Sequence, residues 1–121
     1  MHGKGEFYWT NGNKYTGEFR NGMRHGKGTL NYYYGYVYTG DWKSGKPEGK
    51  GVYTRGAGGD FYEGDFKNGW KNGEGTYTWS DGSKHVGHFE NDMFNGDGIE
   101  YYPDGSIKNK GRFENDIFKG E

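Results

Sequence analysis

A five-residue motif recurs five times along this chain, at a step of 23 or 24 residues. Its copies share an opening residue that is usually tyrosine, a central glycine and a closing aromatic residue. The five copies are Tyr15–Phe19, Tyr38–Trp42, Tyr62–Phe66, His85–Phe89 and Asn109–Phe113. A repeat of this period predicts stacked supersecondary units, each of which completes its hydrophobic face only against its neighbours. Function is therefore expected on an extended surface and not in a closed pocket.

The composition indicates that any buried core is aromatic. Only 29% of the 121 residues are apolar and 26 are glycine, yet the chain holds 8 Phe, 12 Tyr and 4 Trp. Low hydrophobicity often marks disorder, but disordered segments are poor in aromatic residues. Here the aromatic residues recur in register with the glycines, which favours an ordered repeat.

Several classes of protein are excluded at this stage. The chain has no cysteine, and therefore no disulfide, thiolate metal site or cysteine nucleophile. No apolar run is long enough for a membrane span or a signal peptide, so a cytoplasmic location is expected. The net charge of −1 argues against nucleic-acid binding. Charge is nevertheless divided, because residues 1–61 carry nine Lys and Arg against five Asp and Glu, and residues 62–121 carry seven against twelve.

The order of residues within a unit predicts a β-hairpin. In the opening motif the first, third and fifth residues share one strand face. Turn signals follow at Asn21-Gly22, Ser44-Gly45, Asn68-Gly69, Asn91-Asp92 and Asn115-Asp116. The next strand begins with two glycines on one face, as in Gly26-Lys27-Gly28. The simplest geometry lays the aromatic rings of one strand over the bare glycine backbone of the next.

This pattern of tyrosine, glycine, closing aromatic and glycine pair resembles the MORN (membrane occupation and recognition nexus) repeat, over essentially the whole chain. The resemblance implies an all-β fold, an elongated single-layer antiparallel sheet of tandem β-hairpins with aromatic residues lining a groove. The chain departs from the pattern at His85, Asn109, Asp92, Asp116 and Pro47-Glu48. We predict one array, made of a partial repeat 1–14, repeats 15–37, 38–61, 62–84 and 85–108, and a partial repeat 109–121.

Both predicted ends stop midway through a unit and leave a strand edge open. An open edge can pair with another chain. We therefore expect either a longer array or self-association through the open strand edges.

Catalytic, metal and cofactor sites have little support in the sequence. His85 and His88 are expected on opposite faces of a strand, so a shared metal is not expected. The serines lie in turns without a base nearby. Gly40–Lys46 resembles the start of a phosphate-binding loop, but Pro47 stands where serine or threonine is required. We expect no enzyme activity, no metal and no cofactor.

The first functional hypothesis is a scaffold that binds a protein partner, a peptide or a helix, along an aromatic groove. Large stiff rings make good interface anchors. The candidate residues are Tyr15, Phe19, Tyr38, Trp42, Tyr62, Phe66, Trp79 and Phe89. The alternative interpretation is that these rings are simply the core. By resemblance, the setting is the cytoskeleton, a cilium or a membrane–cytoskeleton junction.

The second hypothesis is a peripheral module for anionic membranes or phosphoinositides. Basic residues near an anionic leaflet contribute about 1 kcal/mol each. The candidates are Arg20, Arg24, Lys27, Lys43, Lys46 and Lys50, treated as one face. A solvated polar face is the alternative. A third hypothesis, from the resemblance, is that the array positions a linked enzyme, as in some lipid kinases and a lysine methyltransferase.

Overall fold

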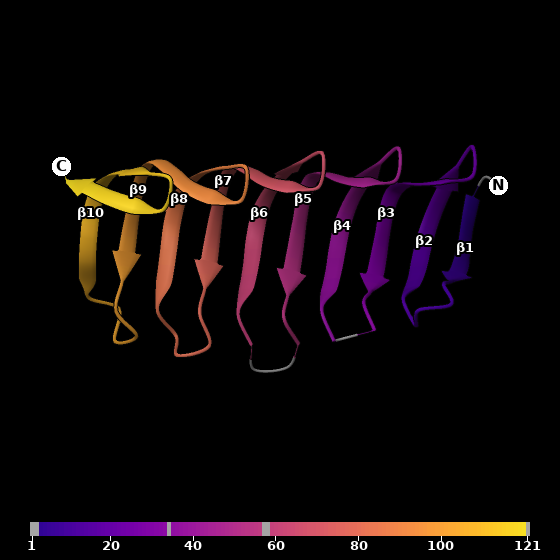
Figure 1. Cartoon of the computed structure of the whole chain (residues 1–121), viewed down its shortest axis with the longest axis horizontal. Coiled ribbons are helices and arrows are strands. Elements are labelled where there is room, and N and C mark those ends of the chain that lie inside the picture. The colour runs from indigo at the N-terminus through magenta and orange to yellow at the C-terminus, as the bar shows by residue number, and fades with distance from the viewer. Residues whose placement is uncertain (1–2, 34, 57–58, 121) are drawn as a thin grey trace.

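The structure, a computed structural model, describes residues 3–33, 35–56 and 59–120. Within these ranges, eleven strands form one antiparallel sheet whose spatial order follows the chain (Figure 1). The strands are β1 (Gly3–Tyr8), β2 (Lys14–Arg20), β3 (Met23–Asn31), β4 (Val37–Lys43), β5 (Lys46–Thr54), β6 (Phe61–Lys67), β7 (Trp70–Thr78), β8 (Lys84–Glu90), β9 (Met93–Tyr101), β10 (Ile107–Glu114) and β11 (Ile117–Gly120). The predicted fold class is confirmed. Residues 1, 2, 34, 57, 58 and 121 of the predicted array lie outside the described residues.

Tight turns and longer loops alternate along the sheet. Two-residue turns close the hairpins β2–β3, β4–β5, β6–β7, β8–β9 and β10–β11, here called hairpins 1 to 5. Both residues of the first turn have positive φ, 53° at Asn21 and 79° at Gly22. These angles match the turn type that fits the twist of paired strands. In hairpin 4, Asn91 and Asp92 adopt the same conformation, with φ of 50° and 70°.

A row of glycines crosses the ten strands β1 to β10. Gly17 pairs with Gly28, and Gly28 pairs with Gly40 on the next strand. The complete row is Gly5, Gly17, Gly28, Gly40, Gly51, Gly64, Gly75, Gly87, Gly98 and Gly111. A Cβ atom added at Gly28 would overlap the ring and hydroxyl of Tyr15. The predicted packing of rings on bare glycine backbone is therefore confirmed.

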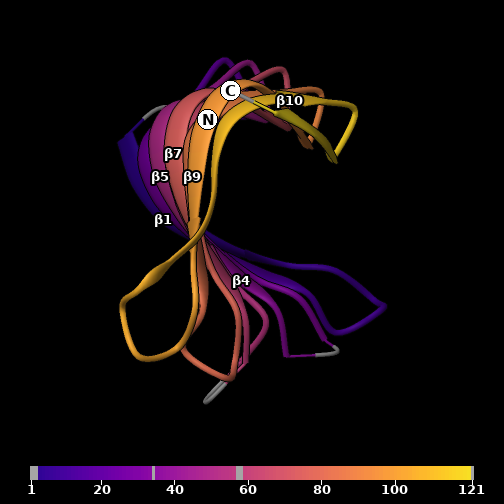
Figure 2. The same ribbon diagram turned by 90° about the vertical axis from the view of Figure 1, so that its left-hand side faces the viewer.

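The strands bend sharply at this row. Tyr38 and Trp42 are four residues apart on β4, which on a straight strand is a separation of about 13 Å. Their ring centroids are 5.0 Å apart. The strand must therefore fold at Gly40 toward the side that carries the rings, and Gly40 has a φ of 154°. Figure 2 shows the result, a C-shaped cross-section in which the tight-turn ends curl over one face. We call that face concave and the opposite face convex.

A β-bulge fixes each bend, and side chains satisfy its polar groups. In hairpin 3 the register shifts between Gly64 and Phe66, where Asp65 of β6 stands opposite residues 72–74 of β7, so the extra residues lie on β7. The Tyr62 hydroxyl donates to the Asp65 carbonyl at 2.9 Å, and the Asp65 carboxylate accepts the Glu74 N–H at 3.0 Å. Hairpins 1 and 2 contain the same two hydrogen bonds. Their members are Tyr15, Glu18 and Lys27 in hairpin 1, and Tyr38, Asp41 and Lys50 in hairpin 2. The opening tyrosine and the acidic fourth residue thus stabilise an irregularity in the ladder.

The core is a continuous stack of rings on the concave face. Each opening tyrosine contacts the closing aromatic residue of its own hairpin and that of the next. Tyr38 lies 5.0 Å from Trp42 and 4.9 Å from Phe66, with both pairs edge to face. Edge-to-face pairs are favourable beyond their buried area. The array is therefore held together from one hairpin to the next by its rings as well as by strand pairing.

The aspartates at two turns have a structural role. The Gly45 N–H of hairpin 2 donates to the Arg24 carbonyl of hairpin 1 at 2.9 Å, and the equivalent N–H of Asp92 donates to the Lys71 carbonyl. Asp92 adds a second link, because its carboxylate accepts the Lys71 N–H at 2.6 Å. Asp116 does the same for the Phe94 N–H at 2.8 Å. These departures from glycine therefore join neighbouring turns.

Candidate binding surfaces

The structure places most of the predicted groove residues in the core. Seven of the eight side chains are between 0% and 8% exposed, and the eighth, Trp79, is half-buried. The seven are Tyr15, Phe19, Tyr38, Trp42, Tyr62, Phe66 and Phe89. A partner that approaches the concave face therefore finds more exposed surface on the partly buried rings packed against this core.

That layer is a second set of aromatic side chains, which we call the aromatic tier. Its members are Trp9, Tyr32, Tyr53, Tyr77, Trp79 and Phe94, all half-buried. Tyr53 shows how it is placed, because β5 pairs Tyr53 with Tyr38 on one side and with Tyr62 on the other. Trp79 extends the tier, with its ring 5.1 Å from Tyr77 and 5.8 Å from Phe94. Of these six residues, only Trp79 belongs to the groove residues predicted from the sequence.

Two cations lie among these rings. The Arg24 guanidinium is 5.3 Å from the Trp9 ring and 5.0 Å from the Trp42 ring, and it donates to the Gly45 carbonyl at 2.9 Å. Burial lowers the pKa of Arg24, but a guanidinium stays charged in proteins. Its charge is thus held against apolar surface, where cation–π attraction is strongest.

Lys71 holds the equivalent position in hairpin 3. Its ammonium lies 5.9 Å from the Tyr53 ring, 5.7 Å from the Tyr62 ring and 3.6 Å from the Asp92 carboxylate. Only 19% of the side chain is exposed. The concave face therefore combines an apolar floor with positive charge at two hairpins.

His85 places a polar imidazole ring in the otherwise aromatic core. It occupies the tyrosine position of hairpin 4, is 1% exposed, and stacks on Phe94 at 3.8 Å. Neither ring nitrogen has a hydrogen-bond partner, although Nδ1 lies 3.8 Å from a Glu100 oxygen. Burial lowers the pKa of His85, and the Glu100 carboxylate opposes this shift. His85 is consequently a neutral imidazole at neutral pH.

We expect His85 to make stability depend on pH. Its folded pKa lies below the unfolded value of 6.5, so the unfolded chain binds the extra proton as the pH falls through that value. The contribution of neutral His85 to the free energy of unfolding should therefore be fully present above pH 6.5. The free energy of unfolding should decrease as the pH falls below that value. Urea titrations at about pH 8 and about pH 5.5 measure the decline.

The matched variant is His85→Tyr, which restores the hydroxyl found in hairpins 1 to 3 and removes the titrating group. It should show a smaller loss of stability between the two pH values than the parent chain. An equal loss in the two proteins would contradict the assignment, because the other histidines contribute equally to both.

The six basic residues of the membrane hypothesis do not share one face. Arg20, Lys43 and Lys46 lie beside the tight turns, and Arg24 lies on the concave face. Lys27 and Lys50 lie on the convex face, where they form ion pairs with Asp41 and Asp65. The register thus places Arg24 alone on the concave face, and the other five point to the opposite side, three of them at the tight turns.

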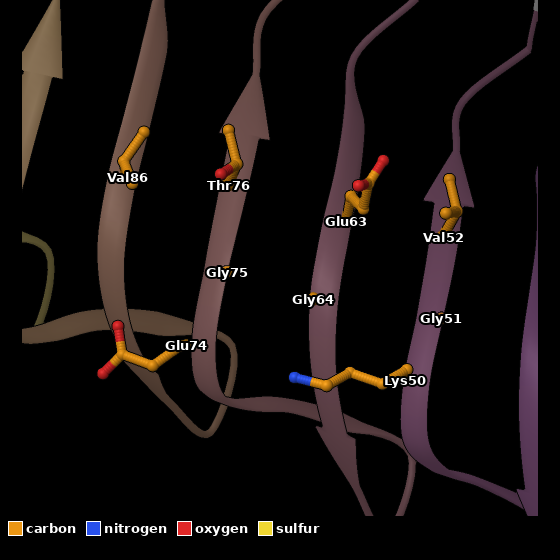
Figure 3. Close-up of a pocket in the computed structure, with 9 residues that line it drawn as sticks. All are labelled: Lys50, Gly51, Val52, Glu63, Gly64, Glu74, Gly75, Thr76 and Val86. Carbon is orange, nitrogen blue, oxygen red and sulfur yellow. The ribbon is translucent and has the colours of Figure 1, made fainter.

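The convex face carries a shallow hollow over the glycine row (Figure 3). Lys50 and Glu74 stand on one side of the bare backbone, and Val52, Glu63, Thr76 and Val86 stand on the other. Thr76 is the cross-strand partner of Glu63, and the hollow is shallow and open to solvent. We therefore assign the hollow no chemistry.

Other chemical sites were also examined over the described ranges. His88 lies on the convex face, away from His85, and its Nδ1 is 2.8 Å from the Asn95 carbonyl. In residues 3–33, 35–56 and 59–120, no three His, Cys, Asp or Glu side chains are grouped as a metal site would require. The same part of the chain holds no helix that could cross a bilayer.

An open sheet of tandem hairpins, bent at a glycine row around stacked rings, defines a class of β-hairpin repeat protein. A family model for the MORN repeat matches residues 1–14, 15–33, 38–59, 62–84 and 85–107. The chain therefore belongs to the MORN repeat family. Such repeats bind membranes or proteins and are generally non-catalytic. No curated protein sequence matches the chain.

Proposed function

We propose that this chain is a non-catalytic scaffold that binds a protein partner along its concave groove. The observation that carries the proposal is the aromatic tier, a row of half-buried rings on top of a core that is already complete. Rings in the tier do not all have to be buried for the sheet to fold. They remain available to a partner, and tyrosine and tryptophan are prominent among residues that dominate binding energy.

The dimensions of the groove suit an elongated partner. Eleven strands with a spacing of about 4.8 Å extend over roughly 48 Å. A helix of about 30 residues covers that length at 1.5 Å per residue. An amphipathic helix or an extended peptide with regularly spaced apolar side chains would therefore contact several hairpins at once.

The two cations on the concave face indicate which charges a partner would carry. Arg24 and Lys71 are two hairpins apart, or about 19 Å at the usual strand spacing. Carboxylates on the partner would meet both cations if they lay about 13 residues apart on a helix. The proposed ligand is thus an apolar segment with acidic residues toward both ends.

The proposed setting is cytoplasmic, at the cytoskeleton, a cilium or a membrane–cytoskeleton junction. Support comes from the association of MORN repeats with membrane-proximal and cytoskeletal proteins. Direct lipid binding has less support, because Arg24 lies on the concave face and Lys27 and Lys50 are paired with Asp41 and Asp65. We therefore propose protein binding alone.

A random peptide library selected on the purified chain tests this function. We expect enriched peptides that carry apolar anchors together with acidic residues. Tyr53→Ala and Trp79→Ala should each weaken the selected peptides at least tenfold, since truncated anchors commonly cost about 1–2 kcal/mol or more.

Val86→Ala is the matched control, because Val86 is 38% exposed on the convex face. It should leave peptide affinity unchanged. The proposal would be wrong if Val86→Ala weakened binding as much as Tyr53→Ala, or if no peptide were enriched.

A further inference from the structure

The five tight turns lie along one long edge of the molecule (Figure 1), and the residues beside them are exposed except for Met93, which is half-buried. In each hairpin, the last residue before the turn pairs with the first residue after it. The pairs are Arg20 with Met23, Lys43 with Lys46, Lys67 with Trp70, Glu90 with Met93, and Glu114 with Ile117. We call these ten residues the turn edge.

The turn edge faces away from the groove. Phe19 is buried in the concave core, so the next residue along the strand, Arg20, points to the other face. The apolar members of the edge are unusually open, with Met23 46%, Trp70 50% and Ile117 59% exposed. An exposed apolar row between charged side chains is typical of an interaction surface. This surface does not overlap the aromatic tier.

The charges of the turn edge change sign along its length. The residues before the turns are basic in hairpins 1, 2 and 3 and acidic in hairpins 4 and 5. Among the described residues, Arg20, Lys43 and Lys67 form no ion pair. Because the hairpins repeat regularly, the step from Arg20 to Lys43 matches the step from Glu90 to Glu114. When the edge is reversed on itself, Arg20 therefore meets Glu114 and Lys43 meets Glu90, whereas the central Lys67 meets its own copy.

We propose that the turn edge binds the turn edge of a second copy of this chain, in antiparallel orientation about a two-fold axis at hairpin 3. Arg20 then faces Glu114 of the other copy, and Lys43 faces Glu90. Met23 packs toward Ile117, and the two Trp70 rings meet at the axis beside Lys67. A two-fold axis forms each of these contacts twice, as in any isologous dimer.

The expected dimer is weak. Five turns spaced by about 10 Å give an edge about 40 Å long and only two residues wide. An interface of this size belongs to the small class that supports transient association. Exposed ion pairs weaken as salt screens them. We therefore expect a Kd in the micromolar range that rises with ionic strength.

Sedimentation equilibrium of the full 121-residue chain, from about 5 to about 500 µM, measures this association. The parent should move from monomer to dimer. Arg20→Glu with Lys43→Glu should raise the Kd at least tenfold, and so should Glu90→Lys with Glu114→Lys. The chain that combines all four substitutions regains complementarity and should dimerise like the parent. An equimolar mixture of the two double variants should form a heterodimer.

Lys108→Glu with Lys110→Glu is the matched control, because it changes the net charge equally on exposed residues of β10 away from the turns. It should leave the Kd unchanged. The proposal would be overturned by a parent that stays monomeric at 500 µM. It would also be overturned by dimers that survive charge reversal, or by monomers that instead bind anionic vesicles through these cations.

Discussion

Gly75→Val should abolish cooperative folding of the array or cost at least about 3 kcal/mol, because an added Cβ overpacks a complete core. A Cβ at Gly75 would overlap the Tyr62 hydroxyl and lie 2.5 Å from ring carbons of the same residue. The ring is fully buried and its hydroxyl is bonded to Asp65, so it has nowhere to move. Urea unfolding followed by tryptophan fluorescence measures the loss.

Thr76→Ala is the control for that substitution. Thr76 follows Gly75 on β7 but lies on the convex face (Figure 3). Its truncation should change the free energy of unfolding by no more than about 0.5 kcal/mol. If Gly75→Val were equally mild, the close contact between ring and glycine would not be what fixes the bend.

Tyr62→Ala should destabilise the chain by about 3–5 kcal/mol, the usual range for removing a buried aromatic side chain. Tyr62 is 0% exposed and packs edge to face on Phe66 and Phe89, so its loss uncouples hairpins 3 and 4. Urea unfolding should also show a broader transition, because neighbouring hairpins would no longer unfold together.

Tyr62→Phe separates the hydroxyl from the ring. It keeps the packing but leaves the Asp65 carbonyl of the bulge without its donor, which should cost about 1–3 kcal/mol. A phenylalanine variant as stable as the parent would show that the bulge does not depend on this bond. An alanine variant no worse than phenylalanine would contradict the role of the ring.

Much of the architecture could be predicted from the sequence. The two-residue strand period placed Tyr15, Gly17 and Phe19 on one face, and the Asn-Gly pairs located the turns. Local signals of this kind depend only on neighbouring residues, so they survive in the folded chain. The packing of tyrosine on glycine followed from the same periodicity.

The bend could not be predicted in this way. Strand periodicity assumes a straight strand, on which Tyr38 and Trp42 would be too far apart to touch. Once β4 folds at Gly40 the two rings meet and become core, so the surface open to a partner moves up to residues such as Tyr53. The sequence hypothesis named rings of the concave face, and the structure buries seven of those eight.

The basic residues were grouped without regard to strand alternation. Arg24 follows Met23 on β3, and Met23 pairs with Arg20, so Arg24 lies on the face opposite Arg20 and Lys27. An alignment of the five repeats reveals a charge pattern that this grouping of basic residues missed. The residues that follow the five closing aromatics are Arg20, Lys43, Lys67, Glu90 and Glu114. Their change of sign is visible once the repeats are aligned.

The four tryptophans provide the most direct test of the proposed groove, because they lie in three different environments. Trp9 and Trp79 belong to the aromatic tier, Trp42 is 3% exposed with its Nε1 bonded to the Gly28 carbonyl, and Trp70 is 50% exposed on the turn edge. We would record the indole N–H resonances by NMR while titrating a selected acidic, apolar peptide into the chain. Protein binding in the groove predicts large shifts for Trp9 and Trp79 and little change for Trp70. A shift confined to Trp70 would contradict it and place the partner on the opposite side of the sheet.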